Sequence, residues 1–348
     1  MKSPLIKNGF TLVELMISIV LGLLIVAAAI QLFITGQTSL NMQRSMADIQ
    51  DNGNFGLNYL TLDFRKANLD AGNAVANDQT PYGGIVLTSI TNRSTNSRTP
   101  AVVASANINY AVNVNLLSRG AGQTVGTDNE WTGASNTGTN KSDQLVIQYK
   151  PNQVGTDCEG NNITAADITA GTYIVQRYFL RPDGTNTQDL ALACDAGRYT
   201  TSKDLTHADY SGTRAYGGAG QIILRRVDYF HVLLGTSEGS FDSPNNFRYM
   251  SIKDYMAITP TVLAPVATSI PSPRLRIQSI QVGMLVRASD SVGNDSNLRT
   301  RNASSFKVLD KDVTLETTLQ NGQYLRQVVS QAVAIRNGLG IRGTGDGL

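Results

Sequence analysis

Charged side chains are scarce in this chain. Only 16% of its 348 residues are Asp, Glu, Lys or Arg, whereas a soluble domain usually carries about 25%. The 29 basic and 27 acidic side chains nearly cancel, so the sequence lacks the basic excess that is typical of nucleic-acid-binding domains. Two cysteines are too few for a disulfide-rich miniprotein, and 41% apolar residues exclude an intrinsically disordered chain.

Long apolar runs are also rare, and one segment near the N-terminus stands out. Residues 15–43 carry no charge, and residues 15–30 are strongly apolar. The segment is long enough to cross a bilayer as a helix. Lys2 and Lys7 precede it, and no basic residue follows until Arg44, which predicts a cytoplasmic N-terminus. Everything after about residue 40 is then expected outside the cytoplasm.

Two ordinary interpretations of this segment remain open. One is a secretory signal peptide cleaved at the small residues 27–29, and the other is a plain single-pass anchor. Neither explains Glu14, because a carboxylate in an apolar helix costs at least about 2.5 kcal/mol near the bilayer centre. An acid in that position should have a partner.

Residues 9–14, with the sequence GFTLVE, resemble the signature of type IV prepilins and of the related type II secretion pseudopilins. The resemblance implies that a prepilin peptidase cuts after Gly9 on the cytoplasmic side and methylates the new N-terminal residue, Phe10. It also implies that Glu14 is the carboxylate that sets subunit register during assembly. Residues 1–9 would then be the leader peptide.

Charge pairing gives Glu14 a physical role. Cleavage leaves a positively charged amine on Phe10, at a helix end buried in lipid or in a filament core. Each lone charge is costly there, whereas an amine–carboxylate pair between neighbouring subunits removes most of that cost. We therefore expect a subunit to slide until its Glu14 meets the Phe10 amine of its neighbour.

Helical spacing continues beyond the apolar segment. One face carries Met42, Met46, Ile49, Gly53, Leu57, Leu60 and Phe64. This pattern predicts a membrane half of the helix (residues 10–34) followed by an amphipathic half (residues 35–68) that packs on the rest of the protein, with an end near Gly72. Bends or local melting are expected at the helix-weakening residues Gly22, Gly36, Gly53 and Gly56.

Residues 69–348 predict an extracytoplasmic β-rich domain. Strands are expected at 144–150, 172–180, 221–234, 274–288 and 324–336, where β-branched and aromatic residues lie between Gly, Pro and Asn clusters. The last of these segments also fits helical spacing, and residues 71–141 predict long loops. The fold class is therefore α+β: a long N-terminal helix packed on an antiparallel β-sheet domain with long loops.

Cys158 and Cys194 lie outside the cytoplasm on this topology, where disulfides persist. We expect them to be bonded, which would stabilise the protein by about 4 kcal/mol in the chain-entropy account. Two free buried thiols are the alternative.

Several downstream stretches resemble the PilW-type minor pilins. They are SDQLVIQY (142–149), DCEG (157–160), RYFLR (177–181), LACD (192–195) and YLRQVVSQAVAIRNG (324–338). The resemblance implies a minor pilin of a type IV pilus. The J-type minor pseudopilin of type II secretion is the nearest alternative.

A possible catalytic motif occurs at residues 235–239, GTSEG, which match the G-x-S-x-G elbow of hydrolases. The elbow needs a helix after the serine and a histidine later in the chain. Here no helix is expected, and His207 and His231 both precede Ser237. We therefore predict no catalytic residues, although a membrane-anchored periplasmic enzyme is the alternative of another class.

Metal and nucleic-acid sites are weakly indicated. The two cysteines and two histidines lack the close spacing of zinc ligands, and Asp183, Asn186 and Asp189 form at most a loose calcium loop. His231 is expected to be a half-buried strand residue. The candidate DNA-contacting arginines are expected to point outward from strands: Arg225, Arg226, Arg274, Arg276 and Arg287. No metal, cofactor or direct nucleic-acid contact is predicted.

The sequence as a whole predicts a non-enzymatic minor pilin in the tip or initiation complex that primes pilus assembly. It would reside in the inner membrane and then in the pilus at the cell surface. Expected partners are other minor pilins, the major pilin, the prepilin peptidase, the inner-membrane assembly platform, the lipid bilayer and a tip adhesin. Motility, adhesion or DNA uptake would be downstream effects.

Overall fold

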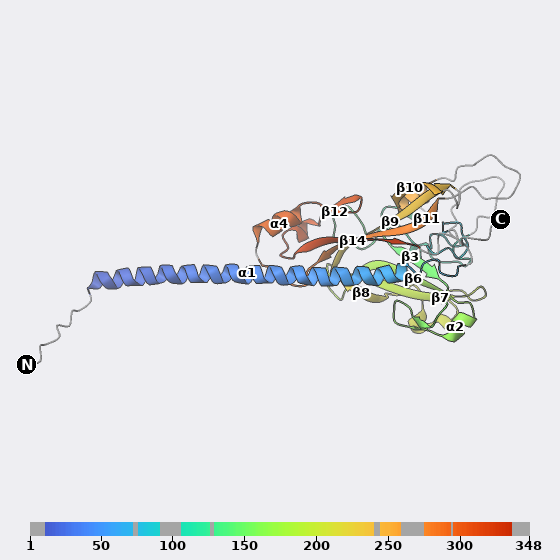
Figure 1. Cartoon of the computed structure of the whole chain (residues 1–348), viewed down its shortest axis with the longest axis horizontal. Helices are drawn as coiled ribbons and strands as arrows, with labels where there is room; N and C mark the ends of the chain where they lie inside the picture. Colours follow the sequence, from blue (N-terminus) through green and yellow to red (C-terminus); the bar gives the residue numbers. More distant parts are fainter. Residues whose placement is uncertain are drawn as a thin grey trace, which may run out of the picture.

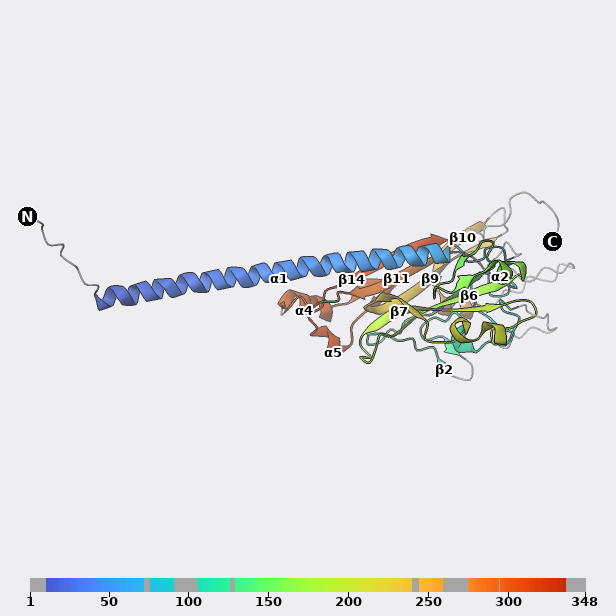
Figure 2. The same cartoon turned by 90° about the horizontal axis from the view of Figure 1, so that it is seen from below.

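A single long helix dominates the outline of the molecule. The computed structural model describes residues 11–71, 76–90, 106–125, 129–239, 244–258, 275–293 and 295–335. Helix α1 (Leu12–Phe64) runs unbroken for 53 residues, about 80 Å at 1.5 Å per residue. Its N-terminal half projects away from the domain, and its C-terminal half lies along it (Figures 1 and 2).

Two antiparallel four-stranded sheets form the domain. The first has the order β3 (Leu145–Tyr149), β6 (Tyr173–Pro182), β7 (Leu190–Tyr199) and β8 (Gln221–Arg225). The second has the order β10 (Pro244–Ser251), β9 (Val227–Gly239), β11 (Arg276–Arg287) and β14 (Arg326–Ala334). The expected α+β fold of a long helix on antiparallel sheets is confirmed.

The other described elements are short. Two-stranded pairs are β1 (Thr124–Val125) with β2 (Asn129–Glu130), β4 (Gly155–Thr156) with β5 (Asn162–Ile163), and β12 (Phe306–Val308) with β13 (Lys311–Val313). The helices are α2 (Ala165–Thr169), α3 (Ile252–Ala257), α4 (Ser296–Ala303) and α5 (Thr317–Gln320). Single 3-10 turns are η1 (Val114–Leu116), η2 (Ala208–Tyr210) and η3 (Gly212–Arg214).

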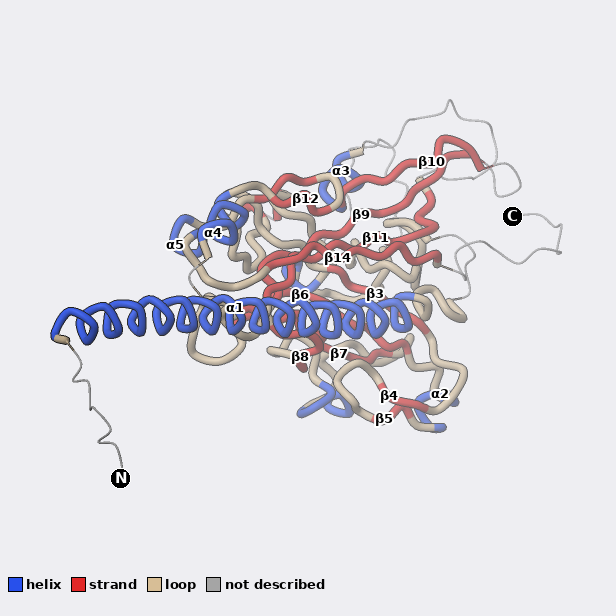
Figure 3. The backbone as a smooth tube through the Cα atoms, turned by 60° about the vertical axis from the view of Figure 1, so that its left-hand side comes forward, coloured by secondary structure: helices blue, strands red, loops and turns tan. Residues whose placement is uncertain are grey.

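Helix α1 lies across the junction of the two sheets (Figure 3). At Gly53, an added Cβ would lie 3.0 Å from Cγ1 of Val329 in β14, and at Gly56 it would lie 2.8 Å from Cδ2 of Leu224 in β8. These two glycines therefore let the helix backbone approach both sheets. We expected glycines to bend or melt the helix, but α1 is continuous through all of them. At Gly53 and Gly56, packing against the sheets outweighs the propensity cost of about 1 kcal/mol per glycine.

The main core fills the space between α1 and the sheets. Leu57, Leu60 and Phe64 are buried there with apolar side chains of β3, β7, β9 and β11. The predicted helix face is largely confirmed, with one error: Met46 is 41% exposed and Ser45 is buried instead. Phe64 also ends the helix earlier than the predicted residue 68, and residues 65–70 form turns.

The predicted strand 221–234 is in fact two strands in different sheets. Strand β8 pairs with β7, whereas β9 pairs with β10 and β11. Between them Arg226 has φ 61°, a left-handed conformation that turns the chain from one sheet to the other. The segment 324–336, which also fitted a helix, forms strand β14.

Candidate functional site

The start of α1 is the first candidate site. Thr11 is the N-cap, and its hydroxyl accepts a hydrogen bond from the Glu14 amide (3.3 Å). In return Oε2 of Glu14 accepts from the Thr11 amide (3.0 Å) and hydroxyl (2.9 Å). This capping box satisfies backbone donors at the helix end and holds the carboxylate in the first turn. Gly9 and Phe10 lie outside the described residues, so the expected cleavage and methylation stay predictions.

The projecting half of α1 presents apolar side chains on every side. All residues from 11 to 37 are exposed, and an 18-residue window of α1 has a mean hydropathy of 2.8. Among the described residues α1 is the one helix that is long and apolar enough to span a membrane. Nothing in the described part of the domain covers this surface, so it requires lipid or other subunits.

The outer face of the packed half is also partly apolar. Phe55 and Leu62 are 67% and 61% exposed, seven residues apart and therefore on one face of the helix. The inner face includes a buried acid, Asp63, which accepts a hydrogen bond from the Tyr178 hydroxyl (2.9 Å) and pairs with Lys66 (2.7 Å). Apolar periodicity alone did not identify Asp63 as a buried residue.

Cys158 and Cys194 are joined in a disulfide, as expected. Cys194 lies in β7, and Cys158 lies in the loop after β4; both are buried. The Tyr59 hydroxyl of α1 donates to the Cys158 carbonyl (3.3 Å). The bond therefore ties the sheet to a loop that also contacts the helix.

Loss of this disulfide should destabilise the domain. Because it closes a loop with a sequence separation of 36, Cys194→Ser is expected to lower the free energy of unfolding by up to about 4 kcal/mol. Urea unfolding followed by the fluorescence of Trp131, the one tryptophan, measures this change. Cys158→Ser should cost the same, and the double variant no more than either single variant. Quantitative labelling of both thiols in the native protein would contradict the bond.

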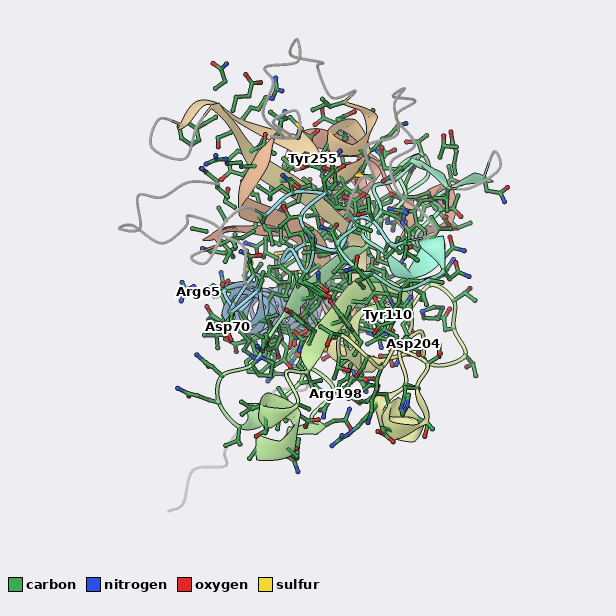
Figure 4. The ribbon with its side chains drawn as sticks, turned by 90° about the vertical axis from the view of Figure 1, so that its right-hand side faces the viewer. Arg65, Asp70, Tyr110, Arg198, Asp204 and Tyr255 are labelled. Atoms are coloured by element: carbon green, nitrogen blue, oxygen red, sulfur yellow. A yellow bond between two sulfur atoms is a disulfide. The ribbon has the colours of Figure 1, made fainter. Side chains whose placement is uncertain are left out.

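A buried ion-pair cluster closes the loop region beside the disulfide. Arg198 donates to Asp157 and Asp167, each at 3.0 Å, and its side chain is 1% exposed. Figure 4 shows Arg198 beside α2, on the opposite side of the domain from Tyr255. Because the one guanidinium pairs with both carboxylates, and Arg214 lies 3.9 Å from Asp167 as a second positive charge, the cluster fixes the loop around α2.

The possible calcium ligands are bound by other side chains. Asp183 lies 3.5 Å from Arg225, and Asp189 pairs with Arg226 (2.7 Å) and Arg287 (2.6 Å). No cluster of three metal-ligating side chains occurs in the part of the chain that the structure describes. The expectation that the strand arginines point outward is wrong for Arg287, which is 5% exposed.

His231 is fully buried, not half-buried as expected. It is 2% exposed, and its two ring nitrogens contact Asp143 (2.6 Å) and Asp310 (2.7 Å). Burial works to lower the pKa of His231, but the two carboxylates outweigh it and raise the pKa. The side chain therefore links β9 to the turn between β12 and β13.

The serine motif does not form a hydrolase elbow. Ser237 is buried within β9, and the strand continues to Gly239. An elbow instead exposes its serine at a sharp turn into a helix. His231 precedes Ser237 in the same strand and is bound by two carboxylates, so these residues do not form a nucleophile–base pair.

Comparisons with known proteins match two separate parts of the chain. Residues 6–30 match the prokaryotic N-terminal methylation motif, and residues 184–337 match type IV pilus-assembly protein W. No curated protein matches the chain. Among solved structures, a type IV-like pilin from Thermus thermophilus is similar, with 11% identity, a TM-score of 0.34, and coverage of 83% of this chain and 97% of that one. With its GFTLVE segment, apolar helix and PilW match, this chain is a member of the type IV prepilin superfamily that resembles the PilW-type minor pilins.

Proposed function

We propose that this protein is a minor pilin of the tip or initiation complex that primes assembly of a type IV pilus. One observation carries the proposal: the GFTLVE segment leads directly into a helix whose first half is wholly exposed and whose second half is packed on the domain. A helix of this kind must insert its first half into lipid and later into a bundle of neighbouring helices.

The chain divides accordingly into four parts. Residues 1–9 are the leader, 10–34 the membrane half of the helix, 35–68 the half packed on the domain, and 69–348 the extracytoplasmic domain. Residues 11–37 are all exposed, and the first buried side chain of the helix is Ser45, which supports a boundary between the halves in this region. The basic leader favours an N-terminus in the cytoplasm.

Assembly would use the amine of Phe10 and the carboxylate of Glu14. After cleavage the amine lies immediately before the N-cap Thr11, and the capping box holds Glu14 one turn away. The carboxylate is then held at a fixed height on the helix, and the amine belongs to the residue directly before the cap. A neighbour that matches amine to carboxylate is stabilised in one register and in no other.

Processing gives the direct test. Mass analysis of the mature N-terminus is expected to find a chain that begins at methylated Phe10. A start at Ile30 would indicate ordinary signal peptidase, and an intact Met1 would indicate a plain anchor; either result would contradict the proposal.

The proteins that co-purify with the chain distinguish a minor pilin of a type IV pilus from a pseudopilin of type II secretion. Co-purification of the membrane-extracted protein is expected to recover other minor pilins and the major pilin. Recovery of pseudopilins and secretion components instead would favour the J-type pseudopilin. The prepilin peptidase and the inner-membrane platform are expected in both cases, so they do not discriminate.

A further inference from the structure

A pocket of about 170 Å³ lies where the β6–β7 turn, the β8–β9 junction and the start of β14 meet. We call it the arginine pocket, because Arg226, Arg287 and Arg326 line it. Its volume is roughly ten times the minimum that one water molecule needs. A small ligand or a single side chain of another molecule therefore fits.

The pairing of the strands brings two arginines onto one face. Arg287 of β11 and Arg326 of β14 are directly opposite each other, an arrangement in which like charges destabilise a sheet. The register between β9 and β11 shifts at Asp228, and such a bulge redirects a side chain. The Asp228 carboxylate accepts from Nε of Arg326 (2.7 Å) and lies 3.7 Å from Nε of Arg287.

The charges around the pocket do not balance. Asp189 binds Arg226 and Arg287 at 2.7 and 2.6 Å. Burial acts to raise the pKa of Asp189, but the two arginines outweigh it and lower the pKa, so the group is ionised near neutral pH. Three guanidinium groups thus face two carboxylates, Asp189 and Asp228, and one positive charge is in excess.

Buried donors remain unused at the same place. Arg326 is 1% exposed, and its Nη2 makes no hydrogen bond among the described residues; the same holds for Nε of Arg287, which is 5% exposed. A buried donor without an acceptor is unfavourable. Arg287 is held over the Tyr324 ring, 4.8 Å from its centroid, which limits its freedom to turn toward another acceptor.

We propose that the arginine pocket binds one carboxylate group. A carboxylate carries the single negative charge that the wall lacks and offers acceptors to guanidinium donors. A dianion would leave one buried charge uncompensated, which is costly. The carboxylate belongs either to a small free acid or to an acidic side chain of another protein.

The test uses the full processed chain in a detergent without carboxylate groups. Titration with ¹³C-labelled acetate, followed by NMR, is expected to show saturable binding that chloride at equal ionic strength does not reproduce. Gln188 lines the pocket, and Gln188→Glu places a carboxylate on its wall. This variant should bind acetate at least tenfold more weakly. Gln153→Glu, on an exposed loop after β3, makes the same charge change and should leave binding unaltered.

Two further ligands, blocked aspartate and sulfate, test where the bound carboxylate comes from and whether the pocket prefers a single negative charge. Blocked aspartate (N-acetyl-aspartate amide) that binds more tightly than acetate identifies an acidic side chain as the natural occupant, and the reverse order identifies a small free acid. The proposed site would be contradicted if acetate did not bind, or if both glutamate variants weakened acetate binding equally. Sulfate that binds more tightly than either carboxylate and loses affinity in Gln188→Glu would overturn the match to a single charge.

Discussion

Replacing Glu14 with leucine is expected to leave the protein inserted and processed but to remove most of it from the complex with other minor pilins. Insertion should persist, because the helix becomes more apolar. Cleavage should persist, because the junction between Gly9 and Phe10 is unchanged. Assembly should fail, because the buried amine of a neighbour loses its partner at a cost of about 3–5 kcal/mol, which corresponds to at least a hundredfold weaker association.

Ser18 supplies the matched control. It lies one turn after Glu14, is exposed, and donates only to the Glu14 carbonyl of its own helix (2.7 Å). Ser18→Leu therefore makes the same helix more apolar while it keeps the carboxylate. Membrane co-precipitation with the other minor pilins and a count of surface pili should be normal for Ser18→Leu and strongly reduced for Glu14→Leu. Normal values for both variants would refute pairing at Glu14 and leave the family assignment intact.

Local pattern was sufficient to predict the helix and the strands of the two four-stranded sheets other than β7 and β10. The apolar positions Ile49, Leu57, Leu60 and Phe64 recur with helical spacing, and all four are buried. The last three pack on the sheets, whereas Ile49 packs in a separate cluster that includes Leu298 of α4. Each of these predictions depends only on residues that are close together in the sequence, because local backbone geometry sets the spacing of side chains along a helix or a strand. The resemblance to the type IV prepilins was also carried by a short stretch of sequence, the six residues of the GFTLVE segment.

Strand β7 was not predicted, because its sequence LALACDAGRY lacks β-branched residues. It is nevertheless buried along its whole length, since it pairs with β6 on one side and with β8 on the other. Tertiary packing overrides a weak local propensity in such a position. The change of sheet at Arg226 escaped prediction for a similar reason: a left-handed arginine carries no local signal, unlike a glycine.

The arginine pocket could not be predicted from the sequence, because the residues that form its ion pairs are far apart in the chain. Arg287 and Asp189 are 98 residues apart, as are Arg326 and Asp228. Arginine in a strand is usually exposed, so an outward orientation was the natural expectation. Only the pairing of β9, β11 and β14 reveals that Arg287 and Arg326 share the buried carboxylate of Asp228.

Asp228 should therefore be among the most sensitive positions in the domain. Its side chain is fully buried, and its Oδ1 and Oδ2 accept from Asn136 (2.6 Å) and Arg326 (2.7 Å). Asp228→Asn keeps the shape but removes the charge and turns an amide donor toward other donors. The change leaves three arginines with one carboxylate, and we expect the free energy of unfolding to fall by about 3–5 kcal/mol.

Asp70→Asn is the matched comparison, because the chemical change is the same at a pair open to solvent. Asp70 lies 3.8 Å from Lys150, their side chains are 60% and 33% exposed, and exposed pairs contribute about 0–1 kcal/mol. Urea unfolding of both variants, followed by Trp131 fluorescence in detergent, should separate them by at least about 2 kcal/mol. Equal stability of the two variants would mean that the buried arginines do not depend on Asp228. A large loss for Asp228→Asn alone would show that the junction of the two sheets, on which α1 rests, is stabilised by this carboxylate.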